Sequence, residues 1–219
     1  MKALFSISIL FVFVLFSCTK IGKNLTVKRK VVNPLTGEPF PGVKAELLVS
    51  GTLQLPGGGK EIKSTVTDEN GNFELNKFSF KADKVRLGDA HGDYFTIGWY
   101  KDGEYISDGN TLPIKKGKKL NVDLHLVPYG EIKTSLHNVN CGGPEDTLIF
   151  KRSYMVSPTD NVFLPFTFTG CFNNDGAFAK VPNGNYKLEW IVIRSGISNT
   201  FSHMLFVPEN GQAFYNIDY

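Results

Sequence analysis

Apolar residues recur at every second position along most of the chain from residue 25 onward. The pattern is cleanest at Val43, Ala45, Leu47 and Val49, and further runs begin at Leu25, Ile62, Phe95, Val122, Ile132, Leu148, Leu164, Tyr186 and Ala213. A period of two puts alternate side chains on opposite faces of a β-strand. The chain is therefore predicted to be all-β.

Turn residues divide these runs. Asn70-Gly71 lies between two of them and predicts a tight hairpin turn, because this dipeptide readily takes the positive φ angles of a two-residue connection. Pro128 is expected to end the run that starts at Val122, because proline cannot donate a ladder hydrogen bond. We therefore place a boundary near Tyr129 and expect two sandwich-sized domains, residues 25–128 and 129–219.

Composition supports many short strands. Among 219 residues, 18 Phe and 8 Tyr outnumber 3 Met, and 22 Gly and 11 Pro supply turns. The hydrophobic share of 42% and the charged share of 21% are ordinary for globular proteins, which excludes disordered, collagen-like and coiled-coil classes. The net charge of +3 is too weak for a nucleic-acid surface, so no nucleic-acid partner is expected.

The first residues resemble a lipoprotein export signal. Lys2 precedes an apolar run over residues 3–16, which is shorter than the about 20 residues of a spanning helix. The segment Leu15-Phe16-Ser17-Cys18 resembles a bacterial lipobox, although Phe16 is bulkier than the usual residue. We expect a lipoprotein signal peptide at residues 1–17, lipidation of Cys18 and a tether at residues 18–24. An ordinary secretory signal with a chance cysteine is the alternative.

A lipidated Cys18 would anchor the protein to a membrane without spanning it. Thr19 follows the cysteine where many inner-membrane lipoproteins carry Asp, which favours the cell outer membrane, on its periplasmic or its surface face. Of three cysteines, Cys141 and Cys171 then remain as a pair. In an oxidising envelope such a pair tends to form a disulfide, and two reduced core thiols are the alternative.

Two motifs carry a family resemblance over residues 25–128. Asn33-Pro34-Leu35-Thr36-Gly37-Glu38-Pro39-Phe40-Pro41-Gly42-Val43 is followed by Thr67-Asp68-Glu69-Asn70-Gly71-Asn72-Phe73. This spacing resembles the carboxypeptidase regulatory-like, transthyretin-related β-sandwich, with Asn33 in place of the usual Asp. The resemblance implies two consecutive antiparallel Greek-key β-sandwich domains, because Val181-Pro182-Asn183-Gly184-Asn185-Tyr186 is similar to a strand entry in the same superfamily. Lipoproteins of this kind are common in Bacteroidetes.

The chain lacks the sequence motifs of the enzyme classes that its pattern brings to mind. The related hydroxyisourate hydrolases end in Tyr-Arg-Gly-Ser, whereas this chain ends in Tyr215-Asn216-Ile217-Asp218-Tyr219, and none of its four histidines starts a His-x-x-Glu zinc motif. Asp89, His91 and Asp93 are interpreted as a solvated loop rather than a metal site. Asp68 and Asn70 are interpreted as a plain turn, because Ser79 stands where a calcium loop needs Glu. No enzyme activity, cofactor or metal is expected.

Several surface residues are candidates for binding or modification. Tyr100 and Tyr105, with Asp102 and Glu104, could stack against and hydrogen-bond a sugar, since glycan recognition requires aromatic faces beside acceptors. Thr147, in Asp146-Thr147-Leu148, matches a short glycosylation motif. The basic turn Lys115-Lys116-Gly117-Lys118-Lys119 is interpreted as a solvated hairpin rather than a lipid-headgroup contact.

These observations favour a non-enzymatic cell-envelope lipoprotein that acts as a structural, assembly or adhesion module of an outer-membrane complex. The alternative is a surface lipoprotein that binds a glycan, such as a polysaccharide, or a peptide. The membrane, through the lipid anchor, is the one partner that the sequence itself predicts.

Overall fold

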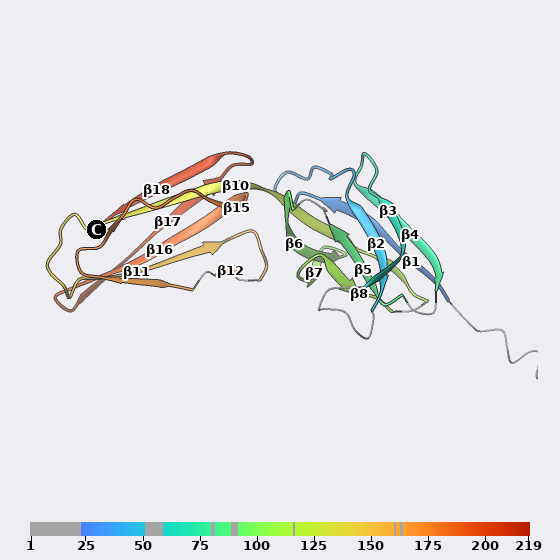
Figure 1. Cartoon of the computed structure of the whole chain (residues 1–219), viewed down its shortest axis with the longest axis horizontal. Coiled ribbons are helices and arrows are strands. Elements are labelled where there is room, and N and C mark those ends of the chain that lie inside the picture. The colour runs from blue at the N-terminus through green and yellow to red at the C-terminus, as the bar shows by residue number, and fades with distance from the viewer. Residues whose placement is uncertain are drawn as a thin grey trace, which may run out of the picture.

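The computed structural model describes residues 23–50, 59–79, 82–88, 92–115, 117–159, 161–162 and 164–219. Every regular element in these ranges is a β-strand, which confirms the predicted all-β class. Figure 1 shows two sandwich-like lobes arranged end to end, with β1 in one and the C-terminus in the other. The predicted signal peptide, Cys18, Asp89, His91 and Lys116 lie outside the described residues.

The N-terminal lobe packs two sheets face to face. One contains β4 (Asn72–Ser79), β1 (Lys23–Val32), the first part of β10 (Asp123–His137), β6 (Tyr94–Lys101) and β7 (Glu104–Ser107), with β9 (Lys119–Asn121) beside β1. The other contains β3 (Lys60–Val66), β2 (Lys44–Val49), β5 (Lys84–Gly88) and β8 (Thr111–Pro113).

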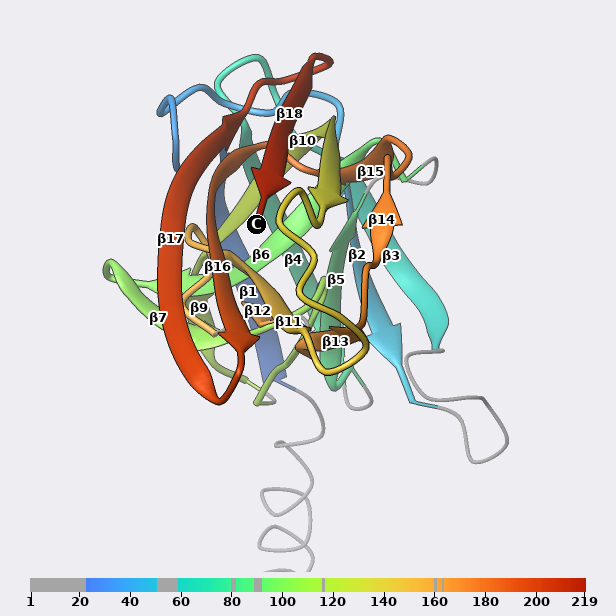
Figure 2. The same ribbon diagram turned by 90° about the vertical axis from the view of Figure 1, so that its left-hand side faces the viewer.

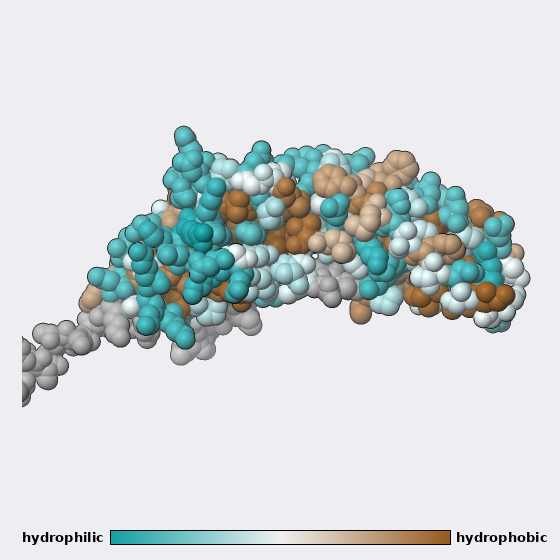
Figure 3. Space-filling view, turned by 180° about the vertical axis from the view of Figure 1, so that it is seen from behind, coloured by the Kyte–Doolittle hydropathy of each residue, from teal (hydrophilic) through white to brown (hydrophobic). Residues whose placement is uncertain are grey.

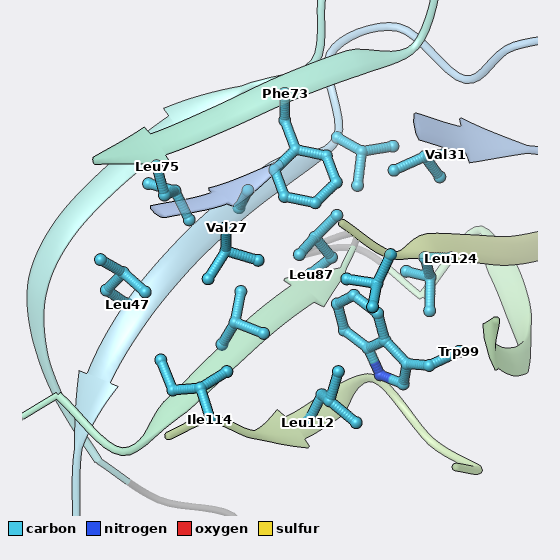
Figure 4. Packing of buried hydrophobic residues seen from close by; sticks show 14 of the residues in the cluster. Val27, Val31, Leu47, Phe73, Leu75, Leu87, Trp99, Leu112, Ile114 and Leu124 are labelled. Carbon is cyan, nitrogen blue, oxygen red and sulfur yellow. The ribbon is translucent and has the colours of Figure 1, made fainter. Parts of the chain in front are cut away.

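Alternating side chains of both sheets fill the core between them. Leu47, Leu75 and Trp99 are fully buried, and Figure 4 shows Trp99 lying among side chains from both layers. Leu47 lies on the run from Val43 to Val49 whose alternation predicted a strand, now seen as β2. A period of two therefore identified the buried face correctly in this lobe.

The C-terminal lobe is also built from two facing sheets. One joins the second part of β10 to β14 (Asn173–Asn174), β15 (Ala179–Pro182) and β18 (Gln212–Asp218). The other has the order β12 (Asn161–Val162), β11 (Thr147–Tyr154), β16 (Gly184–Arg194), β17 (Ile197–Val207), with β13 (Phe166–Thr169) also on β11. Leu136, Leu148, Leu188 and Ile217 are buried between them.

β10 runs continuously from Asp123 to His137, so the expectation that Pro128 ends this strand is wrong. Up to Pro128 the strand pairs with β6, and from Tyr129 it pairs with β15. The Pro128 carbonyl accepts a hydrogen bond from the Asn183 amide at 2.8 Å. Proline is tolerated here because it stands where the strand changes partners, so its missing N–H interrupts no continuous ladder.

Among the strands of the described residues most pairs are antiparallel, as expected, but three are parallel: β1 with β10, β1 with β9, and β10 with β18. The sequence pattern also gave no strand at Ile197–Val207, which the structure shows as β17. Within the described ranges, no helix is long and apolar enough to cross a bilayer.

Candidate binding groove beside the disulfide

The predicted Cys141–Cys171 disulfide is present. Figure 1 shows the segment that follows β10 at the end of the C-terminal lobe away from β1. The disulfide joins the segment that follows β10 to the segment that precedes β14, with the two Cα atoms 5.3 Å apart and the two cysteines 30 positions apart in sequence. The bond therefore ties together two loops at one end of the sandwich, where strand pairing has already ended.

Asp146 organises the same end of the lobe. Its side chain is only 5% exposed, and Oδ2 accepts hydrogen bonds from the Gly142 amide at 2.8 Å, Asn138 Nδ2 at 3.2 Å and Arg194 Nε at 3.1 Å. Arg194 Nη2 also donates to Asn138 Oδ1 at 2.7 Å. Donation from the Gly142 amide, followed by the Asn138 and Arg194 side chains, holds the pKa of the Asp146 carboxyl below its usual value.

This network fixes Arg194 at the end of β16, beside the C-terminal residue. The guanidinium carbon of Arg194 lies 5.7 Å from the centre of the Tyr219 ring. The Tyr219 hydroxyl donates a hydrogen bond to the Phe172 carbonyl at 3.2 Å. The backbone carbonyl of Tyr219 accepts a hydrogen bond from the Val139 amide at 2.8 Å. Burial raises the pKa of the Tyr219 hydroxyl. Tyr219 is thus held between the two loops that the disulfide joins.

A groove of about 490 Å³ opens between β17 and this fixed end of the lobe. Its lining is formed by Asn140, Trp190, Val192, Arg194, Ser195, Ile197, Asn199, Phe201, Asp218 and Tyr219. Trp190 forms part of the floor and is 9% exposed, whereas Phe201 on the rim is 46% exposed. Their rings are nearly parallel, with centroids 5.6 Å apart. The volume lies within the range of small-ligand sites.

Two charged side chains line the groove, Arg194 and Asp218, and each contacts another side chain of the protein. Arg194 pairs with Asp146, and Asp218 Oδ1 lies 3.1 Å from His137 Nδ1. The other polar side-chain groups of the lining residues are the amides of Asn140 and Asn199, the hydroxyls of Ser195 and Tyr219, and the indole N–H of Trp190. The groove thus combines aromatic rings with neutral hydrogen-bonding groups, which suits an uncharged, hydroxyl-rich ligand.

The aromatic residues predicted from the sequence lie in the N-terminal lobe. Tyr100 on β6 and Tyr105 on β7 make an edge-to-face contact at 5.7 Å, and the His125 ring stacks on Tyr100 at 3.8 Å. Burial raises the pKa of Tyr100 and lowers that of His125. One face of the Tyr100 ring is therefore covered by His125, which leaves less aromatic surface for a ligand.

The two acidic residues of that prediction behave differently. Asp102, in the turn between β6 and β7, lies 3.6 Å from Arg29 Nη1, and Glu104 is exposed at the start of β7. The structure brings Tyr100 and Tyr105 together but commits Asp102 to an ion pair. Binding at these four residues stays a prediction.

The remaining candidates are placed as follows. Thr147 begins β11 and is half-buried, with its hydroxyl 3.4 Å from the Glu145 carbonyl, so its glycosylation stays a prediction. Asp68 accepts from the amides of Asn70 and Asn72 at 2.9 and 2.7 Å, which is the geometry of a side-chain-closed turn. Over the part of the chain that the structure describes, no three acidic, histidine or cysteine side chains converge to hold a metal.

A second hollow, of about 620 Å³, lies in the N-terminal lobe beside β1, β3 and β4. Its polar lining carries charges of both signs, including Lys28, Arg29 and Asp68. The one aromatic residue in its described lining, Phe73, is 4% exposed and belongs to the core. It therefore offers no aromatic face, and we regard the groove in the C-terminal lobe as the better candidate site.

Sequence reasoning did not find this groove. Trp190 was recognised only as part of an alternating run, Phe201 lies on the strand that was missed, and Tyr219 was placed in another run. One signal was available, because Ser195-Gly196 between Arg194 and Ile197 can form a two-residue hairpin turn. That turn would have placed Phe201 opposite Trp190.

No protein-family model matches the chain, and no curated protein matches it. Solved structures with a partial likeness include the Bacillus anthracis TIE protein, at 16% identity and a TM-score of 0.35, over 90% of this chain and 34% of that one. GBS52, the minor pilin of Streptococcus agalactiae, shares 11% identity with a TM-score of 0.33, over 90% and 94% of the two chains. The shaft pilin SpaA of Lactobacillus rhamnosus GG shares 9% identity with a TM-score of 0.29, over 91% and 99%.

The chain spans about a third of the TIE protein's length. Likenesses at these TM-scores have no bearing on function, and the resemblance to the carboxypeptidase regulatory-like family stays a prediction.

Proposed function

We propose that the protein is a non-enzymatic, lipid-anchored adhesion or assembly module of the cell envelope, held at the outer membrane through Cys18. The observation that carries the proposal is the position of the groove in the molecule. β1, the first described strand, lies in one lobe, and the C-terminus lies in the other (Figure 1), where Asp218 and Tyr219 line the groove. If the chain is anchored ahead of β1, the lobe that carries the groove would lie farther from the bilayer than the lobe that contains β1.

The rigidity of the groove supports a role in binding. The Cys141–Cys171 disulfide and the hydrogen bonds of Asp146 fix Arg194 and the loop that carries Asn140. A site fixed before its ligand arrives loses less conformational entropy on binding. Such a site is suited to holding a partner firmly.

Co-purification tests this proposal. The full-length chain is isolated from detergent-solubilised native membranes, and proteins that elute with it are identified by mass spectrometry. Cys18→Ala tests the anchor, and Phe201→Ala tests the groove. We expect a stoichiometric partner with the unsubstituted chain that is lost with Phe201→Ala, and release of Cys18→Ala from the membrane fraction. A chain that elutes alone, or a partner retained by Phe201→Ala, would contradict the proposal.

A second candidate function is the binding of a neutral saccharide in the same groove. The observation that favours it is the lining, where Trp190, Phe201 and Tyr219 lie beside the amides of Asn140 and Asn199 while the nearby Arg194 is paired with Asp146. Aromatic faces pack against the C–H faces of sugars, and amide groups donate to and accept from hydroxyls.

Isothermal titration against neutral polysaccharides tests this candidate and separates the two aromatic sites. Phe201→Ala reports on the groove, and Tyr100→Ala reports on the cluster predicted from the sequence. Heat that disappears only with Phe201→Ala supports the groove. Heat that disappears only with Tyr100→Ala assigns binding to the other cluster, and no heat with any neutral polysaccharide rejects the candidate.

A further inference from the structure

β17 is the edge strand of its sheet. Among the described residues, the 11 positions of Ile197–Val207 pair with β16 alone, and no strand covers their other side. Figure 2 shows β17 at the outer margin of the C-terminal lobe, outside β16. Residues 197–202 are all exposed. The free side of this strand is therefore open to solvent.

The hairpin turn fixes which backbone groups point outward. Ser195 and Gly196 have φ angles of +49° and +76°, as in a two-residue type I′ turn, and Arg194 opposite Ile197 is then the first hydrogen-bonded pair. Hydrogen-bonded and non-hydrogen-bonded pairs alternate from that point. The outward N–H and C=O groups belong to Ser198, Thr200, Ser202, Met204 and Phe206.

An independent contact supports this register. Phe206 lies opposite Asn185, whose carbonyl accepts from the Met155 amide at 2.9 Å on the β11 side. Asn185 therefore faces away from β17, as a non-hydrogen-bonded pair requires.

β17 lacks the features that usually protect an edge strand. Its sequence, ISNTFSHMLFV, contains no Pro, Lys, Arg, Asp or Glu, and its pairing with β16 shows no bulge. Phe201, Met204 and Phe206 are 46%, 53% and 54% exposed. Figure 3 shows hydrophobic residues at the surface of the C-terminal lobe. A long, uncharged, regular edge of this kind is a template for pairing with another strand.

We propose that β17 pairs with β17 of a second copy of this chain, antiparallel about a two-fold axis at Ser202. The outward-pointing residues are centred on Ser202, so this register uses every one of them. Ser202 lies opposite its own equivalent, Thr200 opposite the second copy's Met204, and Ser198 opposite its Phe206. Two-fold pairing of one surface with itself is the commonest way for identical chains to associate.

The side chains favour a second copy over an unrelated peptide. A two-fold pair brings identical segments together, and a strand without charged residues opposes no like charges. The register also sets small residues against large ones, since Ser198 meets Phe206 and Thr200 meets Met204. Each exposed apolar side chain on that face of β17 is then flanked by a smaller neighbour that leaves it room.

Pairing would join the two β17 sheets into one continuous sheet. It would also bring the two grooves side by side, because Asn199 and Phe201 line the groove from the inner face of β17. The inference concerns the assembly of the chain and does not depend on what the groove binds. It goes beyond the proposed function and can fail independently of it.

Charge substitution at the two-fold position tests the proposal. The full-length chain in detergent is examined by light scattering coupled to size exclusion. We expect a protein mass of twice the 24.3 kDa chain, less any cleaved leader, for the unsubstituted protein. Ser202→Lys and Ser202→Glu should each halve the mass, and an equal mixture of the two variants should restore it. Ser198→Lys, which meets the second copy's Phe206 rather than itself, is the matched control and should remain dimeric.

Cysteine crosslinking tests the register. Facing residues of a hydrogen-bonded antiparallel pair have Cα atoms about 5.5 Å apart, which suits a disulfide. Oxidation should crosslink Ser202→Cys into a covalent dimer, whereas Thr200→Cys alone should stay single, and the unsubstituted chain reports any link through Cys18. A monomeric unsubstituted chain overturns the proposal, whether or not it captures a foreign peptide. A dimer whose mass is unchanged by Ser202→Lys and by Ser202→Glu also overturns it.

Discussion

Arg194 Nε lies 3.1 Å from Asp146 Oδ2, although the two residues are 48 positions apart in sequence. Asp146 precedes β11, and Arg194 ends β16, the strand that pairs with β11. The pair therefore connects the loop that follows Cys141 to the sheet that contains β11 and β16. This ion pair, with Asn138 between its partners, holds the end of the C-terminal lobe on which the groove is built.

Asp146→Asn should make the protein less resistant to urea at neutral pH. The folded-state pKa of Asp146 is lowered, so the ionised carboxylate contributes stability above its unfolded pKa, near 3.9, and this contribution is lost as the pH falls through the folded value. The urea midpoint of the variant should lie below that of the unsubstituted chain at pH 7. The difference should narrow at pH 3.

Glu145→Gln is the matched control, because Glu145 is the exposed neighbour in the same loop. Its midpoint should follow that of the unsubstituted chain at both pH values. A gap for Asp146→Asn that stays constant with pH would show that the carboxylate charge is not what stabilises the loop.

Local pattern was enough to predict much of this fold. The alternation from Val43 to Val49 anticipated β2, and Asn70-Gly71 correctly marked a turn before β4, because both signals lie within a few adjacent residues. The predicted hairpin at that turn was wrong, since β3 and β4 lie in different sheets and the turn crosses from one sheet to the other. The Cys141–Cys171 pair followed from cysteine number and compartment rather than from geometry. The first two features depend on local information, whereas the disulfide depends on the cysteine count of the whole chain.

The groove could not be predicted in the same way. Phe201 meets Trp190 through a hairpin whose second strand carries Asn199 and His203 on its inward face, so the apolar alternation there is interrupted. Tyr219 reaches the site because β18 pairs in parallel with β10, a long-range choice that no local pattern encodes. An edge strand needs fewer apolar side chains than a central strand. The segment that forms β17 therefore shows no clean apolar alternation and was not predicted as a strand.

Removing the disulfide should destabilise the C-terminal lobe substantially. Cys141→Ser together with Cys171→Ser opens a loop closed across 30 residues, and the chain-entropy account gives a loss of about 3 to 4 kcal/mol in the free energy of unfolding. Urea titration followed by tryptophan fluorescence checks this, since Trp190 lies in the same lobe. Equal midpoints for the variant and the unsubstituted chain would show that the Asp146 network alone holds the loops.

Gly71→Ala should cost much more stability than Gly37→Ala. Both glycines have positive φ angles, +73° and +79°, so each substitution carries the about 1 to 2 kcal/mol penalty of a left-handed alanine. A Cβ on Gly71 would also lie 2.5 Å from the Val31 carbonyl oxygen, whereas one on Gly37 meets nothing within 4 Å. Crowding of this kind adds about 1 to 3 kcal/mol.

Both variants carry the same backbone strain, which cancels when their unfolding free energies are compared. The remaining difference therefore measures how closely the turn at Gly71 approaches β1. Equal losses would mean that β1 shifts away at no cost, contrary to the tight contact seen here.

His137 should stabilise the protein at acidic pH and contribute less at alkaline pH. Its Nε2 lies 3.0 Å from Asp175 Oδ1 and its Nδ1 lies 3.1 Å from Asp218 Oδ1, so the protonated ring can donate to both carboxylates. The hydrogen bond to Asp175, followed by that to Asp218, raises the folded-state pKa of His137. The contribution is complete below the unfolded pKa of about 6.5 and is lost as the pH rises through the folded value.

Thermal unfolding of His137→Gln at pH 5.5 and pH 8.5 checks this expectation. The melting temperature of the variant should fall below that of the unsubstituted chain mainly at pH 5.5. His125→Gln should behave in the opposite sense, because burial lowers the folded-state pKa of His125 and its protonation opposes folding. At acidic pH this variant should gain stability relative to the unsubstituted chain. A loss for His137→Gln that grows toward pH 8.5 would mean that the bridge between β10, β18 and the Asp175 loop does not depend on the proton.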